Sequence, residues 1–94
     1  MVDDGAATAL VERNKSLLAA GIVKVEGDFA RGDAIAVQTK AGREIARGLC
    51  NYAASDVEKI RGKKTAEVRT IMAERAYDEV VHRDNLVITD YLLT

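Results

Sequence analysis

The chain has 94 residues and carries 14 Lys and Arg against 15 Asp and Glu, so its formal net charge is −1. This length supports one domain at most, and a share of 48% apolar with 31% charged residues is typical of a globular chain and not of a disordered one. The longest uncharged apolar stretch, residues 16–23, is far shorter than the ~20 residues that cross a bilayer, and no signal peptide is visible, which predicts a soluble intracellular protein.

Charge is distributed unevenly along the chain. Residues 1–12 carry three acids and no base, residues 13–47 carry 7 − 4 = +3, residues 48–75 carry 6 − 4 = +2, and residues 76–94 carry 1 − 4 = −3. The basic centre can attract phosphate, but a net charge of this size is modest beside dedicated nucleic-acid binders.

The first element predicted is a helix. Asp4 precedes an Ala-rich run in which Ala6, Ala7, Leu10 and Val11 share one helical face, and the helix is expected to end near Asn14. One further turn at residues 16–18 is expected before Gly21, which suits a left-handed helix cap.

Three strands joined by short turns follow. The apolar period changes to two in residues 22–26, 34–39 and 44–52, with turns at Gly27, Gly32 and Gly42 between them. These strands should pair antiparallel. Gly48 interrupts the third of them, which indicates a bulge or a close backbone contact.

Two helices and two strands complete the pattern. Ser55 and Glu58 form a capping box for a short helix that runs to about Arg61, and Thr65 is a second cap before Val68, Ile71 and Met72. Strands are expected at residues 79–82 and 86–88, with a hairpin turn at Asp84-Asn85. The order predicts an α+β, mainly β fold: a partly closed pseudo-barrel of about five short strands with helices inserted.

Two fragments of catalytic motifs are present without the rest of their machinery. Gly27 and Gly32 have P-loop spacing, but Asp33 stands where the phosphate-binding Lys is needed, so turn glycines are the favoured interpretation. His82-Arg83-Asp84 matches the opening of a protein-kinase catalytic loop, but Thr89 occupies the place of the metal-binding Asn. A hairpin turn explains that segment more simply.

Single reactive residues give no catalytic site either. His82 has Asp84 nearby but no nucleophile that can be placed beside it, so a structural or surface role is favoured over general-base catalysis. Cys50 is the only cysteine and fits a small core side chain. It has no partner for a disulfide or for a zinc site, and we predict no catalytic and no metal-binding residue.

Several longer stretches, taken together, resemble a known family. They are Asp3-Asp4-Gly5-Ala6, Ser16-Leu17-Leu18 with Gly21-Ile22, Val25 to Phe29 with Arg31-Gly32-Asp33, Gly42 to Gly48, and Val81 to Val87. In order and spacing they resemble the C-terminal portion of bacterial glutamate 5-kinases, which is a PUA domain, a module named after pseudouridine synthases and archaeosine transglycosylases. The resemblance covers about residues 3–88.

Some features depart from that pattern. Where the family usually has a Gly-Tyr pair after the last helix, this chain has Ala73-Glu74-Arg75-Ala76-Tyr77, which predicts an altered loop. Residues 89–94 extend past the usual end as a tail, and Met1-Val2 resembles a start within a longer protein. The interpretation is one PUA domain, residues 1–94, belonging to a longer kinase.

The resemblance implies a cytoplasmic, homo-oligomeric parent enzyme that uses ATP and Mg²⁺ to phosphorylate the γ-carboxylate of glutamate, the first step of proline biosynthesis. Its active site would lie in an N-terminal amino-acid-kinase domain, so this segment would need no cofactor and would be inactive. The segment would then adjust the assembly or feedback response of the kinase domain.

The alternative implied by other PUA domains is RNA binding, through the first helix and a groove beside the last strands. By position, the phosphate contacts would come from Arg13, Lys15, Arg31, His82 and Arg83. A solvated surface role for these bases is the competing interpretation. We expect no contact with a membrane.

Overall fold

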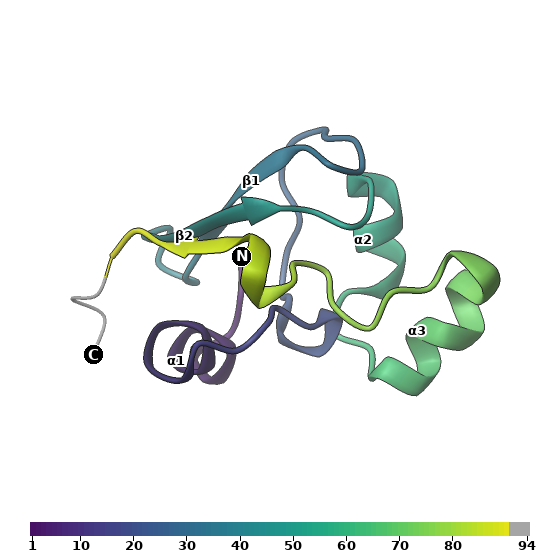
Figure 1. The fold of residues 1–94 in the computed structure, drawn as a ribbon, viewed down its shortest axis with the longest axis horizontal. Coiled ribbons are helices and arrows are strands. Elements are labelled where there is room, and N and C mark those ends of the chain that lie inside the picture. Colours follow the sequence, from purple (N-terminus) through teal and green to yellow (C-terminus); the bar gives the residue numbers. More distant parts are fainter. Residues whose placement is uncertain (91–94) are drawn as a thin grey trace.

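A three-stranded antiparallel sheet organises the fold in the computed structural model, which describes residues 1–90 (Figure 1). Its strands are β1 (Ala34–Gln38), β2 (Glu44–Leu49) and β3 (Leu86–Ile88), in the order β1-β2-β3. The α+β class is therefore confirmed, with three strands among the described residues where about five were expected.

Helices lie beside the sheet on two sides. They are α1 (Asp4–Arg13), α2 (Ala54–Ile60) and α3 (Thr65–Met72). Figure 1 shows α1 below β2 and β3, whereas α2 and α3 lie beyond one end of the sheet. Three single-turn 3₁₀ helices connect these parts: η1 (Ala19–Gly21), η2 (Ala73–Arg75) and η3 (Arg83–Asn85).

One hydrophobic core joins the sheet to the helices. Its largest fully buried side chains are Val2, Leu10, Val37, Ile45, Cys50, Ile60, Val80 and Val81. These residues come from both ends and the middle of the chain, so the core depends on contacts between distant segments. Removing this apolar surface from water is the main source of stability.

The predicted first helix is confirmed, with its start one residue earlier than expected. Asp3 is the N-cap, and its side-chain oxygen accepts a hydrogen bond of 2.7 Å from the N–H of Ala6. The helix ends at Arg13, and its C-cap Asn14 has φ +51°, a left-handed conformation that Asn tolerates better than most residues.

The hairpin of β1 and β2 is also confirmed. Ile35 pairs with Gly48 and Val37 pairs with Ala46, and both β1 side chains point toward the core side of the sheet. The connecting turn contains Gly42 at φ +86°, a conformation that L side chains rarely adopt.

The close backbone contact predicted at Gly48 is present. A β-carbon there would lie 2.6 Å from the carbonyl oxygen of Asn85 and 2.6 Å from Cγ1 of Val81. Gly48 pairs with Leu86, so the missing side chain lets the turn before β3 approach β2.

The prediction of a strand at residues 22–26 is wrong, because this segment forms only one isolated bridge, between Ile22 and Val2. The N–H groups of Val23 and Lys24 both donate to the carbonyl oxygen of Met1, and the carbonyl oxygen of Val23 accepts from the guanidinium of Arg61. A β-ladder needs backbone hydrogen bonds that alternate regularly along one neighbouring strand, and the bonds of this segment do not follow that pattern.

The strand expected at residues 79–82 is also absent, and so is its hairpin with residues 86–88. Val80 and Val81 are consecutive and both buried, which an alternating half-buried strand does not allow. Their N–H groups both bond to the carbonyl oxygen of Leu17. β3 pairs instead with β2.

Three predicted caps were wrong. Helix α2 starts at Ala54, whose N–H donates to the carbonyl oxygen of Phe29, so Ser55 lies inside the helix and forms no capping box. Helix α3 starts at Thr65 with Lys64 as N-cap and no side-chain cap. Gly21 is not left-handed; a β-carbon there would lie 2.5 Å from Cβ of Ala6, so it allows close packing on α1.

The expected tail falls partly outside the described residues. Thr89 and Asp90 still follow β3, since both of their N–H groups donate to the carbonyl oxygen of Ile45. The rest of the expected tail, residues 91–94, lies outside the residues that the structure describes.

Candidate interaction surfaces

A basic hollow of about 380 Å³ lies where the end of α1 meets the segment before β3. It is lined by Lys15, Ser16, Leu18, Glu79, His82 and Arg83. Sixty residues and more separate the two sides in sequence. The isolated bridge between Leu17 and Val81 holds them together, with a hydrogen bond of 2.9 Å from the N–H of Leu17.

Polar contacts fix the backbone of this hollow. The hydroxyl of Ser16 accepts a 2.9 Å hydrogen bond from the N–H of Arg83. Nδ1 of His82 accepts a 3.0 Å hydrogen bond from the N–H of Asp84 and so caps η3. Because Nδ1 is an acceptor here, neutral His82 carries its ring proton on Nε2.

The hollow presents two cations. Lys15 and Arg83 are exposed, and neither forms an ion pair within residues 1–90. Glu79 contributes one negative charge to the same lining. Unpaired Lys and Arg side chains beside a hollow can bind an anion such as a phosphate group, although a carboxylate nearby reduces the attraction.

The five residues expected to contact phosphate are thus divided. Lys15, His82 and Arg83 meet at this basic hollow, whereas Arg13 and Arg31 do not line it. Arg13 is exposed in the last turn of α1. The guanidinium carbon of Arg31 lies 5.1 Å from the ring centroid of Tyr77, in a cation–π contact.

The sequence did not indicate that Ser16, Leu18 and Glu79 would line the hollow with Lys15, His82 and Arg83. They are placed by the single bridge between Leu17 and Val81. One bridge between distant residues leaves no periodic pattern in a sequence, so no local signal marks it.

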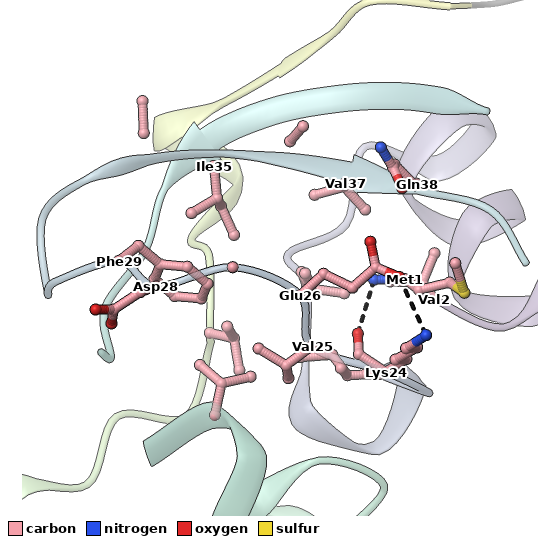
Figure 2. Close-up of a pocket in the computed structure, with 17 residues that line it drawn as sticks. Met1, Val2, Lys24, Val25, Glu26, Asp28, Phe29, Ile35, Val37 and Gln38 are labelled. Carbon is pink, nitrogen blue, oxygen red and sulfur yellow. Dashed lines mark hydrogen bonds and ion pairs between the residues drawn. The ribbon is translucent and has the colours of Figure 1, made fainter. Parts of the chain in front are cut away.

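A second and larger hollow, of about 530 Å³, separates β1 from residues 24–29 (Figure 2). We call it the β1 slot. Its apolar lining comes mainly from Val25, Phe29, Ile35, Val37, Val57 and Val80, and Met1 and Val2 lie at one end of it in Figure 2. In Figure 2, Ile35 and Val37 point from β1 into the space that Val25 and Phe29 approach from the opposite side.

Reactive side chains outside the hollows are held in structural roles. Burial raises the pKa of the Cys50 thiol, which is 1% exposed, so its reactive thiolate form is disfavoured. Within residues 1–90, no three or more His, Cys, Asp or Glu side chains gather as a metal site would require. No helix in this range is long and apolar enough to span a membrane.

The sequence of this chain is similar to those of known glutamate 5-kinases. It is 56% identical to the glutamate 5-kinase of Caldanaerobacter subterraneus subsp. tengcongensis over 89 residues, which are 95% of this chain and 24% of that protein. It is 53% identical to the glutamate 5-kinase of Dictyoglomus turgidum, with the same coverage. The chain therefore spans about a quarter of the length of these curated relatives, in their C-terminal part.

Solved structures support the same grouping. A PUA domain protein from Aeropyrum pernix K1, solved as a tartrate complex, has a TM-score of 0.65 at 31% identity and matches 87% of this chain and 39% of its own. One from Thermoplasma acidophilum has a TM-score of 0.58 at 26% identity and matches 86% of this chain and 44% of its own. Residues 1–72 match the family model of the PUA domain. On sequence and fold together, the chain belongs to the PUA domain family.

Proposed function

We propose that this chain is the accessory PUA module of a glutamate 5-kinase and adjusts the assembly or regulation of an amino-acid-kinase domain that precedes it. The observation that carries the proposal is the 56% identity to a glutamate 5-kinase along 95% of this chain, in a stretch that makes up 24% of that kinase. The remaining three quarters of such a relative have room for a separate catalytic domain.

The proposed parent transfers the terminal phosphoryl group of ATP, with Mg²⁺, to the γ-carboxylate of glutamate, as a step of proline biosynthesis in the cytoplasm. Within residues 1–90, no three or more His, Cys, Asp or Glu side chains gather as a metal site would require, and burial raises the pKa of the Cys50 thiol. The module itself would bind neither ATP nor Mg²⁺.

Deleting residues 1–94 from the full-length kinase tests the proposal. We expect the truncated enzyme to change in oligomeric state, in glutamate-dependent ATP turnover or in inhibition by proline, measured by light scattering and coupled assay. Circular dichroism and thermal unfolding would control for a kinase domain that no longer folds. A truncated enzyme that matches the full-length protein in all three properties would contradict the proposal, and so would ATP turnover by residues 1–94 alone.

RNA binding is the second candidate function, and the basic hollow is the observation that favours it. Lys15 and Arg83 are exposed and free of ion pairs within residues 1–90, and His82 lines the same hollow. Contacts with phosphate would give weak binding that falls as salt concentration rises.

A low-salt titration of residues 1–94 with a structured RNA tests this candidate. Replacing Lys15 and Arg83 together by Ala should weaken binding and reduce the salt dependence by about one counterion per lost contact. Replacing Lys40 and Lys64 together by Ala removes the same charge from exposed positions outside the hollow and is the matched control. Equal loss in both variants would indicate attraction without a site, and no binding at low salt would remove the candidate.

A further inference from the structure

The three-stranded sheet has one face without a covering helix. Figure 1 shows α1 below the sheet, and no helix of residues 1–90 lies above it. On β1, Ala34 and Ala36 are exposed, whereas the residue that follows each of them is more buried. On β2 and β3 the exposed residues are Arg47, Leu49 and Val87. Side chains alternate between the two faces of a sheet, so these five residues share the uncovered side, which we call the outer face.

The outer face is mainly apolar. Four of the five residues are apolar, namely Ala34, Ala36, Leu49 and Val87. The two larger ones are well exposed, Leu49 at 47% and Val87 at 66%. An antiparallel sheet with one solvated face usually has polar residues on that face, and this chain departs from the pattern. An exposed apolar patch of this kind marks a contact with another apolar surface.

The charges of the outer face are balanced within it. The register shifts from Val37 opposite Ala46 to Gln38 opposite Glu44, and this bulge puts Glu44 on the same face as Arg47. Nη2 of Arg47 lies 3.0 Å from Oε1 of Glu44. Arg47 is the one cation on the strands of residues 1–90, so the outer face has no unpaired positive charge for a nucleic acid. Two such faces can also meet without net repulsion.

The strand register places a low row of side chains beside a high row. On the outer face, the cross-strand pairs are Ala34 with Leu49, Ala36 with Arg47, and Gln38 with Glu44. In the first two pairs β1 has a methyl group and β2 a long side chain. In the third pair β1 has an amide that can donate a hydrogen bond and β2 a carboxylate that can accept one. The face is therefore complementary to itself when it is turned about an axis between the two strands.

We propose that the outer face binds the outer face of a second copy of this chain, around a two-fold axis that runs along the hairpin between β1 and β2. Leu49 of each copy then packs on Ala34 of the other, and the aliphatic part of Arg47 packs on Ala36. The amide of Gln38 donates to the carboxylate of Glu44 across the interface. A two-fold interface uses the same patch on both partners, which this arrangement of rows provides. Both partners are this chain, so the inference does not depend on the proposed kinase parent.

The dimer should be weak, because three short strands offer less than the roughly 800 Å² per partner of a standard interface. Sedimentation velocity on residues 1–94, from about 10 µM to about 1 mM, tests the proposal. We expect a monomer that converts to a dimer as concentration rises. Leu49→Thr should raise the Kd of the dimer at least about tenfold, since it removes the side chain that fills the low row. Ala34→Glu should do the same by filling that row.

Val87→Thr is the matched control. It makes the same kind of change on the same face, but on β3, which extends past the edge of the second copy's β1 when the axis lies between β1 and β2. Its Kd should change less than about twofold. Leu49, Ala34 and Val87 are all exposed, so each variant should keep the monomer fold, which circular dichroism verifies.

Isotope-filtered NMR on a mixture of labelled and unlabelled chains locates the contact. We expect intermolecular nuclear Overhauser effects between the methyl groups of Leu49 and the methyl group of the second copy's Ala34. Effects between two Leu49 side chains, or between two β3 strands, would place the axis elsewhere and overturn the proposal.

Three further results would overturn it. The first is a monomer at the highest concentration, and the second is a dimer that Leu49→Thr leaves unchanged. The third is a monomer of residues 1–94 whose Leu49 methyl signals shift only within the full-length kinase, because the kinase domain and not a second copy would then cover the outer face.

Discussion

Gly48 in β2 and Asn85 in η3 approach so closely that a β-carbon on Gly48 would lie 2.6 Å from the carbonyl oxygen of Asn85. This contact sets the distance between β2 and the turn that leads into β3. A backbone oxygen cannot move aside as the end of a flexible side chain can, and Cγ1 of Val81 is equally close on another side.

The first prediction concerns this contact. Gly48→Ala should lower the free energy of unfolding by about 1–3 kcal/mol, the usual effect of overpacking a filled space. Chemical denaturation measures it. Gly5→Ala is the matched control, since a β-carbon there meets only Oδ1 of Asp3 at 3.6 Å and lies within α1. The control should keep or gain stability, because Ala favours helix; a Gly48 variant as stable as that control would contradict the prediction.

The second prediction concerns the backbone at Ala73, which has φ +52° and ψ −120° at the end of α3. L residues with a side chain are strained in this region and Gly is not. Ala73→Gly should therefore raise the stability by about 1 kcal/mol, which shifts Tm by about 4–8 °C in a domain of this size. Ala76→Gly serves as comparison, since φ −71° and ψ 133° are ordinary there. It should lose about 0.5–1 kcal/mol.

The third prediction concerns the buried hydroxyl of Tyr52. It donates a 2.8 Å hydrogen bond to the carbonyl oxygen of Tyr77 and accepts one from the N–H of the same residue. Tyr52→Phe should cost about 1–3 kcal/mol, because both backbone groups lose their partner. The hydroxyl of Tyr77 has no hydrogen bond within residues 1–90, so Tyr77→Phe should stay within about 0.5 kcal/mol of the parent. Equal effects in urea titrations would refute this assignment.

The fourth prediction concerns pH. Burial raises the pKa of the Cys50 thiol in the folded chain above the unfolded value of about 8.5. Stability from the protonated thiol is complete below the unfolded pKa and is lost as pH rises toward the folded pKa, since only the unfolded chain releases the proton. Denaturation between pH 7 and 9.5 should show this decline, and Cys50→Ala should flatten it. If the free energy of unfolding of Cys50→Ala fell with pH as steeply as that of the parent, Cys50 would be excluded as the source of the decline.

Local patterns explain the parts of the fold that were predicted correctly. The α1 helix has a polar cap and apolar residues at helical spacing, and β1 and β2 alternate around a glycine turn, so short-range physics is sufficient for them. The role of Gly48 was also visible, because a glycine inside an apolar strand pattern suggests a close approach.

The incorrect strand predictions and the misplaced start of α2 involve partners far away in sequence. Residues 22–26 have a strand pattern, but their backbone groups form hydrogen bonds with Arg61 and Met1 instead of with a neighbouring strand. Ser55 and Glu58 have the spacing of a capping box, but Ala54 is drawn into the helix by its bond to Phe29. Tertiary contacts overrode local propensity in each of these places.

The candidate surfaces were predicted only in part for the same reason. Three of the five phosphate-contact candidates meet at one hollow because Leu17 bridges Val81. Arg31 stacks on Tyr77 instead, and these two residues are 46 positions apart in the sequence. The turn sequence around Arg31 does not reveal this contact. The β1 slot lies between β1 and residues 24–29, and local side-chain patterns do not show that these two segments face each other.

The double attachment of Val2 has a mechanical consequence. The N–H of Val2 donates to the carbonyl oxygen of Gln38 on one flank. On the other flank, the N–H of Asp3 donates to the carbonyl oxygen of Gly21, and the carbonyl oxygen of Met1 accepts from the N–H of Val23. These bonds run across the direction of this segment. A force that pulls Met1 along the segment therefore loads both flanks in shear, and the bonds must rupture together instead of peeling apart one by one. Tension on this end of the module is carried straight into the core, where Val2 is packed.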